Sequence, residues 1–131
     1  MKLEHIALTI EDAKEIKDFY IDILEMKEVK TFVLNKILAQ KIFGIQKDTN
    51  VFYLQRNNLF LEVFITGEKL KQGFDHICLS VKDRETIVTK AEPQNYECVR
   101  IKRDVFDLIF VKDKSGNIFE IKESNMKNNK I

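Results

Sequence analysis

The feature that most constrains this chain is a phrase that occurs twice. Residues 3–12 are LEHIALTIED and residues 74–83 are FDHICLSVKD. The chain has only two histidines, and they occupy the same place in the two phrases, at His5 and His76. Self-similarity of this kind indicates a structural unit that is present twice. In both phrases apolar residues alternate with small or polar ones, which predicts a β-strand with one buried face.

The first half continues with a helix and three more strands. Asp12 is followed three residues later by Glu15, the spacing of a capping box, so a helix is expected over 13–24. Its apolar positions recur at helical spacing. A strand is expected over 28–34, and a short helix capped by Asn35 should end near Gly44. The stretches NVFYLQR and LFLEVFI flank Asn-Asn, which predicts a hairpin.

The second half repeats this order. After the strand over 74–82, Asp83 is expected to cap a helix over 84–91, which Pro93 stops. YECVRIKR, VFDLIFVK and NIFEIKE are predicted strands, with a turn at DKSG. The sequence therefore predicts two modules of strand, helix and three strands in one structural domain. Their expected bounds are 1–66 for the first module, 67–73 for a linker, 74–123 for the second module and 124–131 for a polar tail.

Each module is expected to bury one face of its first strand against its helix. The residues expected to be buried together are Ile6, Leu8, Ile10, Phe19, Tyr20, Ile23 and Leu24 in the first module, and Ile77, Leu79, Val81, Ile87 and Val88 in the second.

The two halves also end on matched strands. Glu62 in LFLEVF and Glu120 in NIFEIK occupy the same position. A single glutamate in an antiparallel strand normally faces water, and a single buried histidine is normally a satisfied core residue. Two histidines and two glutamates at equivalent positions are better explained as a metal site. Two nitrogen and two carboxylate ligands suit a divalent ion such as Ni, Co, Zn, Mn or Fe.

The sequence resembles the vicinal oxygen chelate superfamily, which contains glyoxalase I, methylmalonyl-CoA epimerase, bleomycin-resistance proteins, fosfomycin-resistance transferases and extradiol dioxygenases. LEHIALTIEDAKEIKDFYIDILEMKEV is similar to the opening strand and helix of that family, and FVKDKSGNIFEIKE is similar to its closing strand. The resemblance covers about residues 1–123. It implies an α+β fold in which two βαβββ modules form an open eight-stranded cup around a metal. It also implies that His5, Glu62, His76 and Glu120 are the metal ligands.

The resemblance further implies a type of reaction. Extradiol dioxygenases and the fosfomycin group use three protein ligands, whereas this chain supplies four, as glyoxalase I and its epimerase relatives do. A metal-dependent lyase or isomerase is therefore expected, one that shifts a proton between neighbouring carbons of an oxygen-chelating substrate such as a hemithioacetal. Glu120 is the expected catalytic base, and Glu62 is the alternative. An acyl-CoA epimerase, or a non-catalytic protein that binds a drug or metabolite, remains open.

One difference from glyoxalase I leaves the identity of the substrate open. Glyoxalase I has an arginine four residues after the first histidine that helps to hold glutathione, and this chain has Thr9 there. Other cations could take that role or could be plain surface charges. Around the four ligands, a thiol and two aromatic side chains could contact the substrate or could be ordinary filling residues. The candidate cations are Arg56, Arg100, Lys102 and Arg103, and the candidate neighbours of the ligands are Cys78, Phe60 and Phe64.

Composition limits the partners. The formal net charge of +1 provides no basic surface for nucleic acid, and no apolar run approaches the length of a membrane helix. No signal peptide fits the N-terminus, and the two cysteines are too few for a disulfide framework. We expect a cytoplasmic protein with a small-molecule substrate. In the resembling family the cup forms within one chain or between two, so a homodimer is one expected arrangement.

Overall fold

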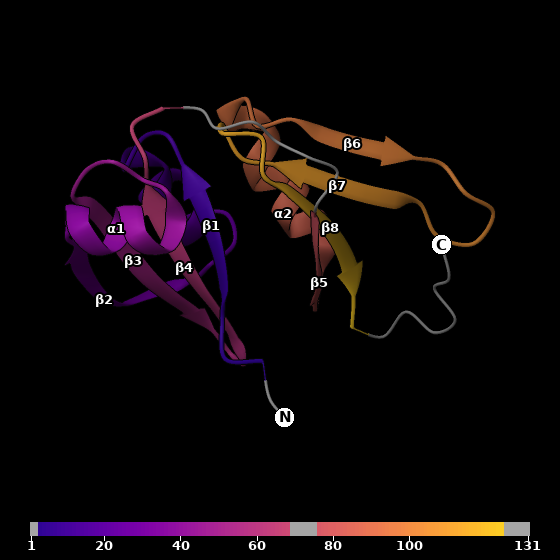
Figure 1. Ribbon diagram of the computed structural model, residues 1–131. Coiled ribbons are helices and arrows are strands. Elements are labelled where there is room, and N and C mark those ends of the chain that lie inside the picture. Colours follow the sequence, from indigo (N-terminus) through magenta and orange to yellow (C-terminus); the bar gives the residue numbers. More distant parts are fainter. Residues whose placement is uncertain (1–2, 69–75, 125–131) are drawn as a thin grey trace. The chain divides into compact units, whose positions relative to one another are not determined.

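The computed structural model describes residues 3–68 and 76–124. The chain divides into two compact units, Met1–Lys71 and Gln72–Ile131, and each contains one four-stranded sheet (Figure 1). We call these units the first and second modules. Among the described residues, none of the helices has the length and apolar character needed to cross a bilayer.

The first module is a mixed sheet with strand order β1-β4-β3-β2. The strand β1 runs parallel to β4, whereas β2, β3 and β4 are antiparallel neighbours. The two-residue turn between β3 and β4 has Asn57 at a positive φ of 53°, which is a conformation that asparagine tolerates well. The strands are β1 (Ile6–Ile10), β2 (Lys27–Leu34), β3 (Thr49–Arg56) and β4 (Leu59–Ile65).

The second module has the same topology, with strand order β5-β8-β7-β6 and a parallel pair β5–β8. The fold class predicted from the repeat, α+β with two βαβββ modules, is confirmed. The strands are β5 (His76–Val81), β6 (Cys98–Ile101), β7 (Leu108–Lys112) and β8 (Ile118–Glu123).

The helices begin and end where the sequence predicts, with one exception. The Asn35 side chain accepts a hydrogen bond at the start of α1 (Lys36–Phe43), which ends at Gly44 in the left-handed conformation, φ 73°. Asp83 caps α2 (Arg84–Ala91), and a 3₁₀ turn that contains Pro93 follows. The exception is the first helix, η1 (Ile16–Ile21), which is a π-helix rather than an α-helix.

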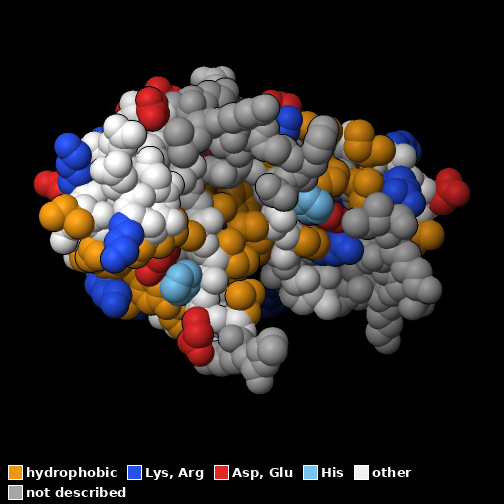
Figure 2. Space-filling view, in the orientation of Figure 1, with side chains coloured by type: hydrophobic (Ala, Val, Ile, Leu, Met, Phe, Trp, Pro, Cys, Tyr) orange, Lys and Arg blue, Asp and Glu red, His pale blue; other side chains and the backbone are white. Residues whose placement is uncertain are grey.

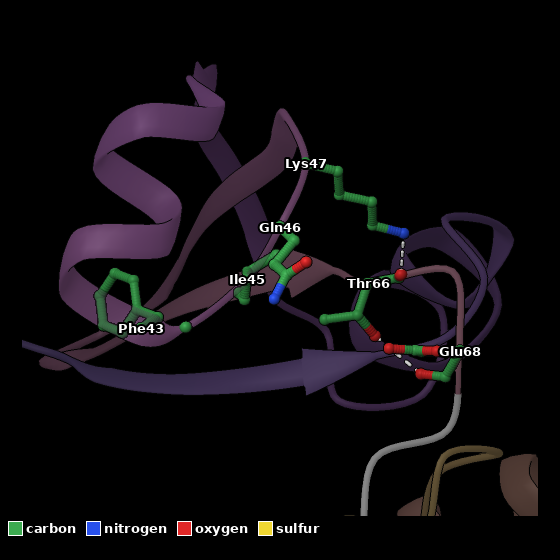
Figure 3. A pocket seen from close by; sticks show the side chains of 7 residues that line it. Phe43, Ile45, Gln46, Lys47, Thr66 and Glu68 are labelled. Atoms are coloured by element: carbon green, nitrogen blue, oxygen red, sulfur yellow. Dashed lines mark hydrogen bonds between the residues drawn. The ribbon is translucent and has the colours of Figure 1, made fainter.

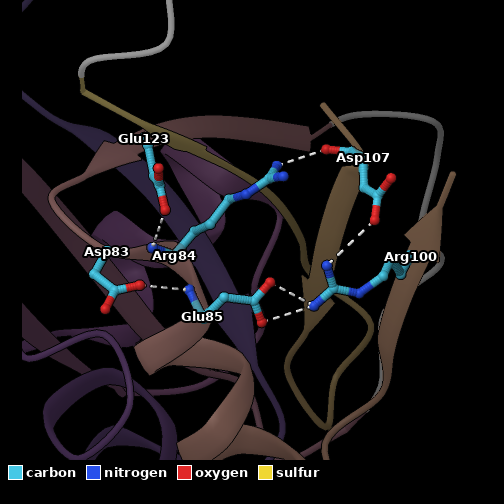
Figure 4. A network of polar contacts seen from close by, with 6 residues as sticks. All are labelled: Asp83, Arg84, Glu85, Arg100, Asp107 and Glu123. Carbon is cyan, nitrogen blue, oxygen red and sulfur yellow. Dashed lines mark hydrogen bonds and ion pairs between the residues drawn. The ribbon is translucent and has the colours of Figure 1, made fainter. Parts of the chain in front are cut away.

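A polar network fixes the connection between β6 and β7, where the second module has no counterpart of α1 (Figure 4). The Arg84 side chain is buried, and its Nη1 donates to the Asp107 carbonyl at 2.6 Å. Arg100 Nη2 donates to both carboxylate oxygens of Glu85, at 2.7 and 2.8 Å, and these bonds raise the pKa of the guanidinium. Because residues 102–107 form this connection, β6 and β7 are shorter than the sequence predicts.

The core of each module agrees in part with the prediction. Ile10 and the predicted residues of the first helix are buried, whereas Ile6 and Leu8 are only half-buried. In the second module Val81, Ile87 and Val88 are buried, and Ile77 and Leu79 are half-buried. The strands β1 and β5 lie at the edges of their sheets, so their first residues are packed on one side only.

Candidate metal centre

In the first module, strand register brings His5 and Glu62 together. Glu62 pairs with Ala7 on β1 and with Tyr53 on β3, so these three side chains leave the same face of the sheet. His5 Nε2 lies 3.3 Å from Glu62 Oε1. The ring of Tyr53 is edge-on to the imidazole at a centroid distance of 6.0 Å and stacks on Phe60 at 5.6 Å.

The second module repeats this arrangement. Glu120 pairs with Cys78 on β5 and with Phe110 on β7. His76 Nε2 lies 3.5 Å from Glu120 Oε1. The ring of Phe110 is edge-on to the imidazole at 6.2 Å, in the place that Tyr53 occupies in the first module. We call the face of each sheet that carries Glu62 or Glu120 the carboxylate face.

The two His–Glu distances suit a pair of metal ligands. Donor atoms about 2.1 Å from one ion lie about 3.0 Å apart at a right angle and about 3.4 Å apart at the tetrahedral angle. A charge-assisted hydrogen bond would be shorter, at about 2.7–2.9 Å. The observed 3.3 and 3.5 Å are close to the separation expected of two ligands that share an ion.

The two glutamates differ in exposure. The Glu62 side chain is 20% exposed, whereas that of Glu120 is 2% exposed. Glu120 Oε2 is buried without a hydrogen-bond partner, and Lys122 Nζ is 3.9 Å away. An unsatisfied buried carboxylate oxygen is costly, and a cation would satisfy it. Both imidazoles reach the surface, with side-chain exposures of 40% for His5 and 43% for His76 (Figure 2).

Each module alone supplies two of the four predicted ligands. Within the described part of either module, no three His, Cys, Asp or Glu side chains form a metal-binding cluster. Two ligands are too few to hold a zinc-like ion by themselves. Each His–Glu pair is therefore half of the donor set that the sequence predicts.

The predicted neighbours of the ligands lie on the carboxylate face. Cys78 is beside Glu120, and burial raises the pKa of its thiol, with a further contribution from the Glu120 carboxylate. Phe60 is half-buried next to Glu62. Phe64 is buried because Phe43 of α1 packs against it, with ring centroids 5.1 Å apart. The inserted helix thus covers one end of the carboxylate face of the first module.

A cavity of about 500 Å³ opens beside this helix (Figure 3). It lies between the end of α1 and the residues that follow β4. The Lys47 ammonium donates to the Thr66 carbonyl at its edge. The cavity contains none of the four predicted ligands, and its lining is Phe43, Gly44, Ile45, Gln46, Lys47, Thr66 and Glu68.

Two of the candidate cations point away from the carboxylate face. Arg56 pairs with Leu59, and both side chains lie on the opposite face of the first sheet. Arg56 Nη1 donates to the Leu24 carbonyl. Arg100 pairs with Ile109 on the opposite face of the second sheet and is bound to Glu85. Neither arginine is available to a ligand near Glu62 or Glu120, because each is engaged in holding its own module together.

Sequence reasoning missed the two aromatic residues that flank the histidines. Tyr53 could have been found by counting back from the predicted Asn-Asn hairpin, because a two-residue turn pairs residue 53 with Glu62. Phe110 could not be counted in the same way. Lys112 lies opposite Ile118, so the loop between β7 and β8 contains residues 113–117. This loop is one residue longer than the predicted four-residue turn.

A match to a family of known sequences defines the class of this protein. The sequence profile of the Glyoxalase/Bleomycin resistance protein/Dioxygenase superfamily matches residues 2–121, so the chain belongs to that superfamily. Comparison with curated proteins finds no match.

Similar solved structures share the fold at low sequence identity. A glyoxalase family protein from Enterococcus faecalis is 19% identical, with a TM-score of 0.68 over 93% of this chain and 97% of that one. The fosfomycin resistance protein FosX from Listeria monocytogenes, in complex with Mn(II) and dihydroxypropylphosphonic acid, is 16% identical, with a TM-score of 0.71 over 95% and 94%. FosX from Mesorhizobium loti is 13% identical, with a TM-score of 0.69 over 95% and 93%.

Proposed function

We propose that the protein is a metal-dependent lyase or isomerase of glyoxalase type. His5, Glu62, His76 and Glu120 together would hold one divalent ion, with Mn, Ni, Co and Zn as the candidates. The observation that carries the proposal is the pairing of a histidine with a glutamate at 3.3 and 3.5 Å on the carboxylate face of each module. The buried Glu120 Oε2 supports it, since this atom has no hydrogen-bond partner among the described residues and the Lys122 ammonium is 3.9 Å away.

Glu120 is the proposed proton carrier. When bound, the ion would act as a Lewis acid and stabilise the negative charge that develops on substrate oxygens as a C–H proton leaves. A carboxylate next to the substrate can take that proton and return it to the neighbouring carbon. Glu120 suits this role because its Oε2 has no hydrogen bond to break and its surroundings exclude water.

The proposal extends to a substrate class. A hemithioacetal is the proposed substrate, and an acyl-CoA that undergoes epimerisation is the alternative. Support comes from the Listeria FosX structure, which contains Mn(II) together with a dihydroxylated phosphonic acid. A divalent ion and an oxygen-rich small molecule thus occur together in this fold. The proposal includes a cytoplasmic location, consistent with Cys78 and Cys98 being free thiols.

A second candidate function is binding without catalysis. The cavity beside α1 supports it, since its volume of about 500 Å³ is within the range of small-molecule sites and no predicted ligand lines it. A binder of this kind would need no ion.

Metal analysis separates the two candidates. The purified chain, loaded with Mn(II) and dialysed, should retain one ion per site, and His76→Ala should lose it. Lys36→Ala, which changes an exposed residue of α1, should retain it and serves as the control. If wild type and His76→Ala both bind no ion, the metal-dependent function is wrong and the binder remains.

A mixing experiment shows whether one chain or two supply the ligands. If the pairs meet across a homodimer, a mixture of His5→Ala and His76→Ala chains, unfolded and refolded together, contains some sites with all four ligands. Metal binding should then recover in the mixture although neither variant binds alone. If the pairs meet within one chain, every chain in the mixture lacks a ligand and no binding returns.

A further inference from the structure

A row of four side chains crosses the carboxylate face of the first module. Lys30 on β2 pairs with Tyr53 on β3, Tyr53 pairs with Glu62 on β4, and Glu62 pairs with Ala7 on β1. Residues that are directly opposite on neighbouring strands share a face. The row therefore runs from an ammonium group through a phenol to the predicted metal ligand. Its strands lie side by side in Figure 1.

The ammonium group of Lys30 is held near the phenol. Lys30 Nζ lies 5.4 Å from the centre of the Tyr53 ring and 5.8 Å from that of Phe32, within the range of cation–π contacts. Among the described residues, Lys30 has no carboxylate partner and the Tyr53 hydroxyl has no hydrogen bond. Lys30 is exposed and Tyr53 is half-buried, so two donors on neighbouring strands are without a partner among the described residues.

The equivalent row of the second module has neither group. There Val99 pairs with Phe110, Phe110 with Glu120, and Glu120 with Cys78. Two lysines on this face of the second module are already matched, Lys112 by Glu97 at 3.1 Å and Lys122 by Glu120 at 3.9 Å. Among the described residues, the lysine beside the aromatic ring of this row and without a carboxylate partner is therefore a feature of the first module.

We infer that Lys30 and the Tyr53 hydroxyl form a subsite for an anionic group, a carboxylate, phosphonate or phosphate, of the molecule that the protein binds. Two strand spacings separate Lys30 from Glu62, about 10 Å between Cα atoms. A small molecule with oxygens at the ion can span that separation and place its charge at Lys30. The inference rests on the proposed function in assigning this anion to the substrate. It restricts that substrate to a negatively charged one.

A competing explanation is that Lys30 only protects an edge strand. The strand β2 lies at the edge of its sheet, and lysines at edges prevent the pairing of sheets between molecules. Lys27 offers a matched control, since it lies on the same strand, is also exposed and pairs with Gln55 on the carboxylate face. Unlike Lys30, it has no contact with the Tyr53 ring among the described residues. Edge protection predicts that the two lysines are equivalent, and the subsite predicts that they are not.

The first experiment compares two chelators on the Mn(II)-loaded protein by isothermal titration. Acetohydroxamate is a small ligand with two oxygens, and the monohydroxamate of succinic acid adds a carboxylate. Wild type should bind the carboxylate-bearing ligand about tenfold more tightly, the effect expected of one charged hydrogen bond. Lys30→Met should remove this preference, Tyr53→Phe should reduce it, and Lys27→Met should keep it. Equal affinity of wild type for the two ligands would overturn the inference while leaving the metal function intact.

The second experiment needs no metal. The metal-free full chain, labelled with ¹⁵N, is titrated with methylphosphonate, and the amide signals of Lys30 and Tyr53 should shift. The shifts should be lost in Lys30→Met and retained in Lys27→Met. If these shifts occur but neither chelator binds the Mn(II)-treated protein, the subsite stands and the metal function is wrong. If both variants lose the shifts equally, the lysines act only as edge charges and the inference is wrong.

Discussion

The two modules have the same backbone plan and the same pair of predicted ligands, yet they surround those ligands differently. In the first module Glu62 is 20% exposed and lies in a row with the phenol of Tyr53 and the ammonium of Lys30. In the second, Glu120 is 2% exposed and lies in a row with Phe110 and Val99. The first carboxylate face is suited to recognising a charged group, and the second to holding a carboxylate away from water. The two copies of a repeated unit can therefore share the same pair of predicted ligands and still differ in the groups around that pair.

The largest effect is expected on catalysis when either glutamate is replaced. Equal losses of activity at Glu62 and Glu120 would contradict the difference between the two modules. In Mn(II)-loaded protein, Glu120→Gln should slow the exchange of the substrate's C–H proton with solvent deuterium by about 10²–10⁴-fold, because an amide cannot act as a base. Glu62→Gln is the matched control, and its rate of proton exchange should fall by a smaller factor. The measurement is deuterium incorporation into hemithioacetals and 2-substituted acyl thioesters by mass spectrometry.

Metal content has to be measured in both glutamate variants, since each change also removes an anionic ligand. A metal-loaded Glu120→Gln protein that exchanges as fast as wild type would make Glu62 the base. Absence of exchange in wild type with every substrate tested would favour the binding protein.

The next effect concerns the residues behind the carboxylates. Leu61 and Phe119 precede Glu62 and Glu120 and are fully buried on the opposite face. Leu61→Ala should cost about 2–5 kcal/mol of stability and Phe119→Ala about 3–5 kcal/mol, because each leaves a cavity. Amide hydrogen exchange then tests whether the two modules unfold independently. If the modules unfold independently, each variant should accelerate exchange only in its own module, whereas a cooperative pair would show acceleration in both.

A smaller effect tests the difference in burial. In metal-free protein Glu120→Met should raise the free energy of unfolding by about 1–3 kcal/mol, since it removes a buried oxygen without a partner. Glu62→Met should change it by less than about 0.5 kcal/mol, as is usual where water reaches the site. Urea unfolding in the presence of a chelator gives both values. Destabilisation by Glu120→Met would show that the contacts with His76 and Lys122 outweigh the cost of the buried oxygen.

The smallest effect is expected in the connection that replaces α1 in the second module. The Arg100 and Glu85 side chains are 42% and 53% exposed, so their ion pair is screened by solvent. Arg100→Ala should lower stability by less than about 1 kcal/mol, and the loss should shrink in concentrated salt. Thermal unfolding at two salt concentrations checks this. A loss that is large and insensitive to salt would mean that the network supports the second module as much as a helix does.

The sequence predicts the topology of this protein well because the repeat, the helix caps and the strand alternation all depend on local chemistry. Asn35 and Asp83 cap their helices as expected. The residues of β5 alternate between exposed and at least half-buried, as the sequence pattern after His76 predicts. The pairing of each histidine with its glutamate also follows, once the first and last strands of a module are placed side by side.

Other features depend on packing that a single sequence does not express. The difference in burial between Glu62 and Glu120 is not visible in their neighbours along the chain, which are apolar in both cases. The π-helical form of η1 cannot be distinguished from an α-helix by its apolar spacing. Arg100 resembles a free surface cation in the sequence, but the fold brings Glu85 to it.

The parallel pairing of the first and last strands in each module has a consequence for how the protein folds. The hairpin of β3 and β4 is local, whereas pairing of β1 with β4 closes a loop that contains β2, α1 and β3. Closing such a long loop is slow compared with forming a hairpin. His5 directly precedes β1 and Glu62 lies on β4, whereas His76 and Glu120 lie on β5 and β8. Contact between each histidine and its glutamate therefore reports that a module has finished folding, and during synthesis the first contact can form before the second module has left the ribosome.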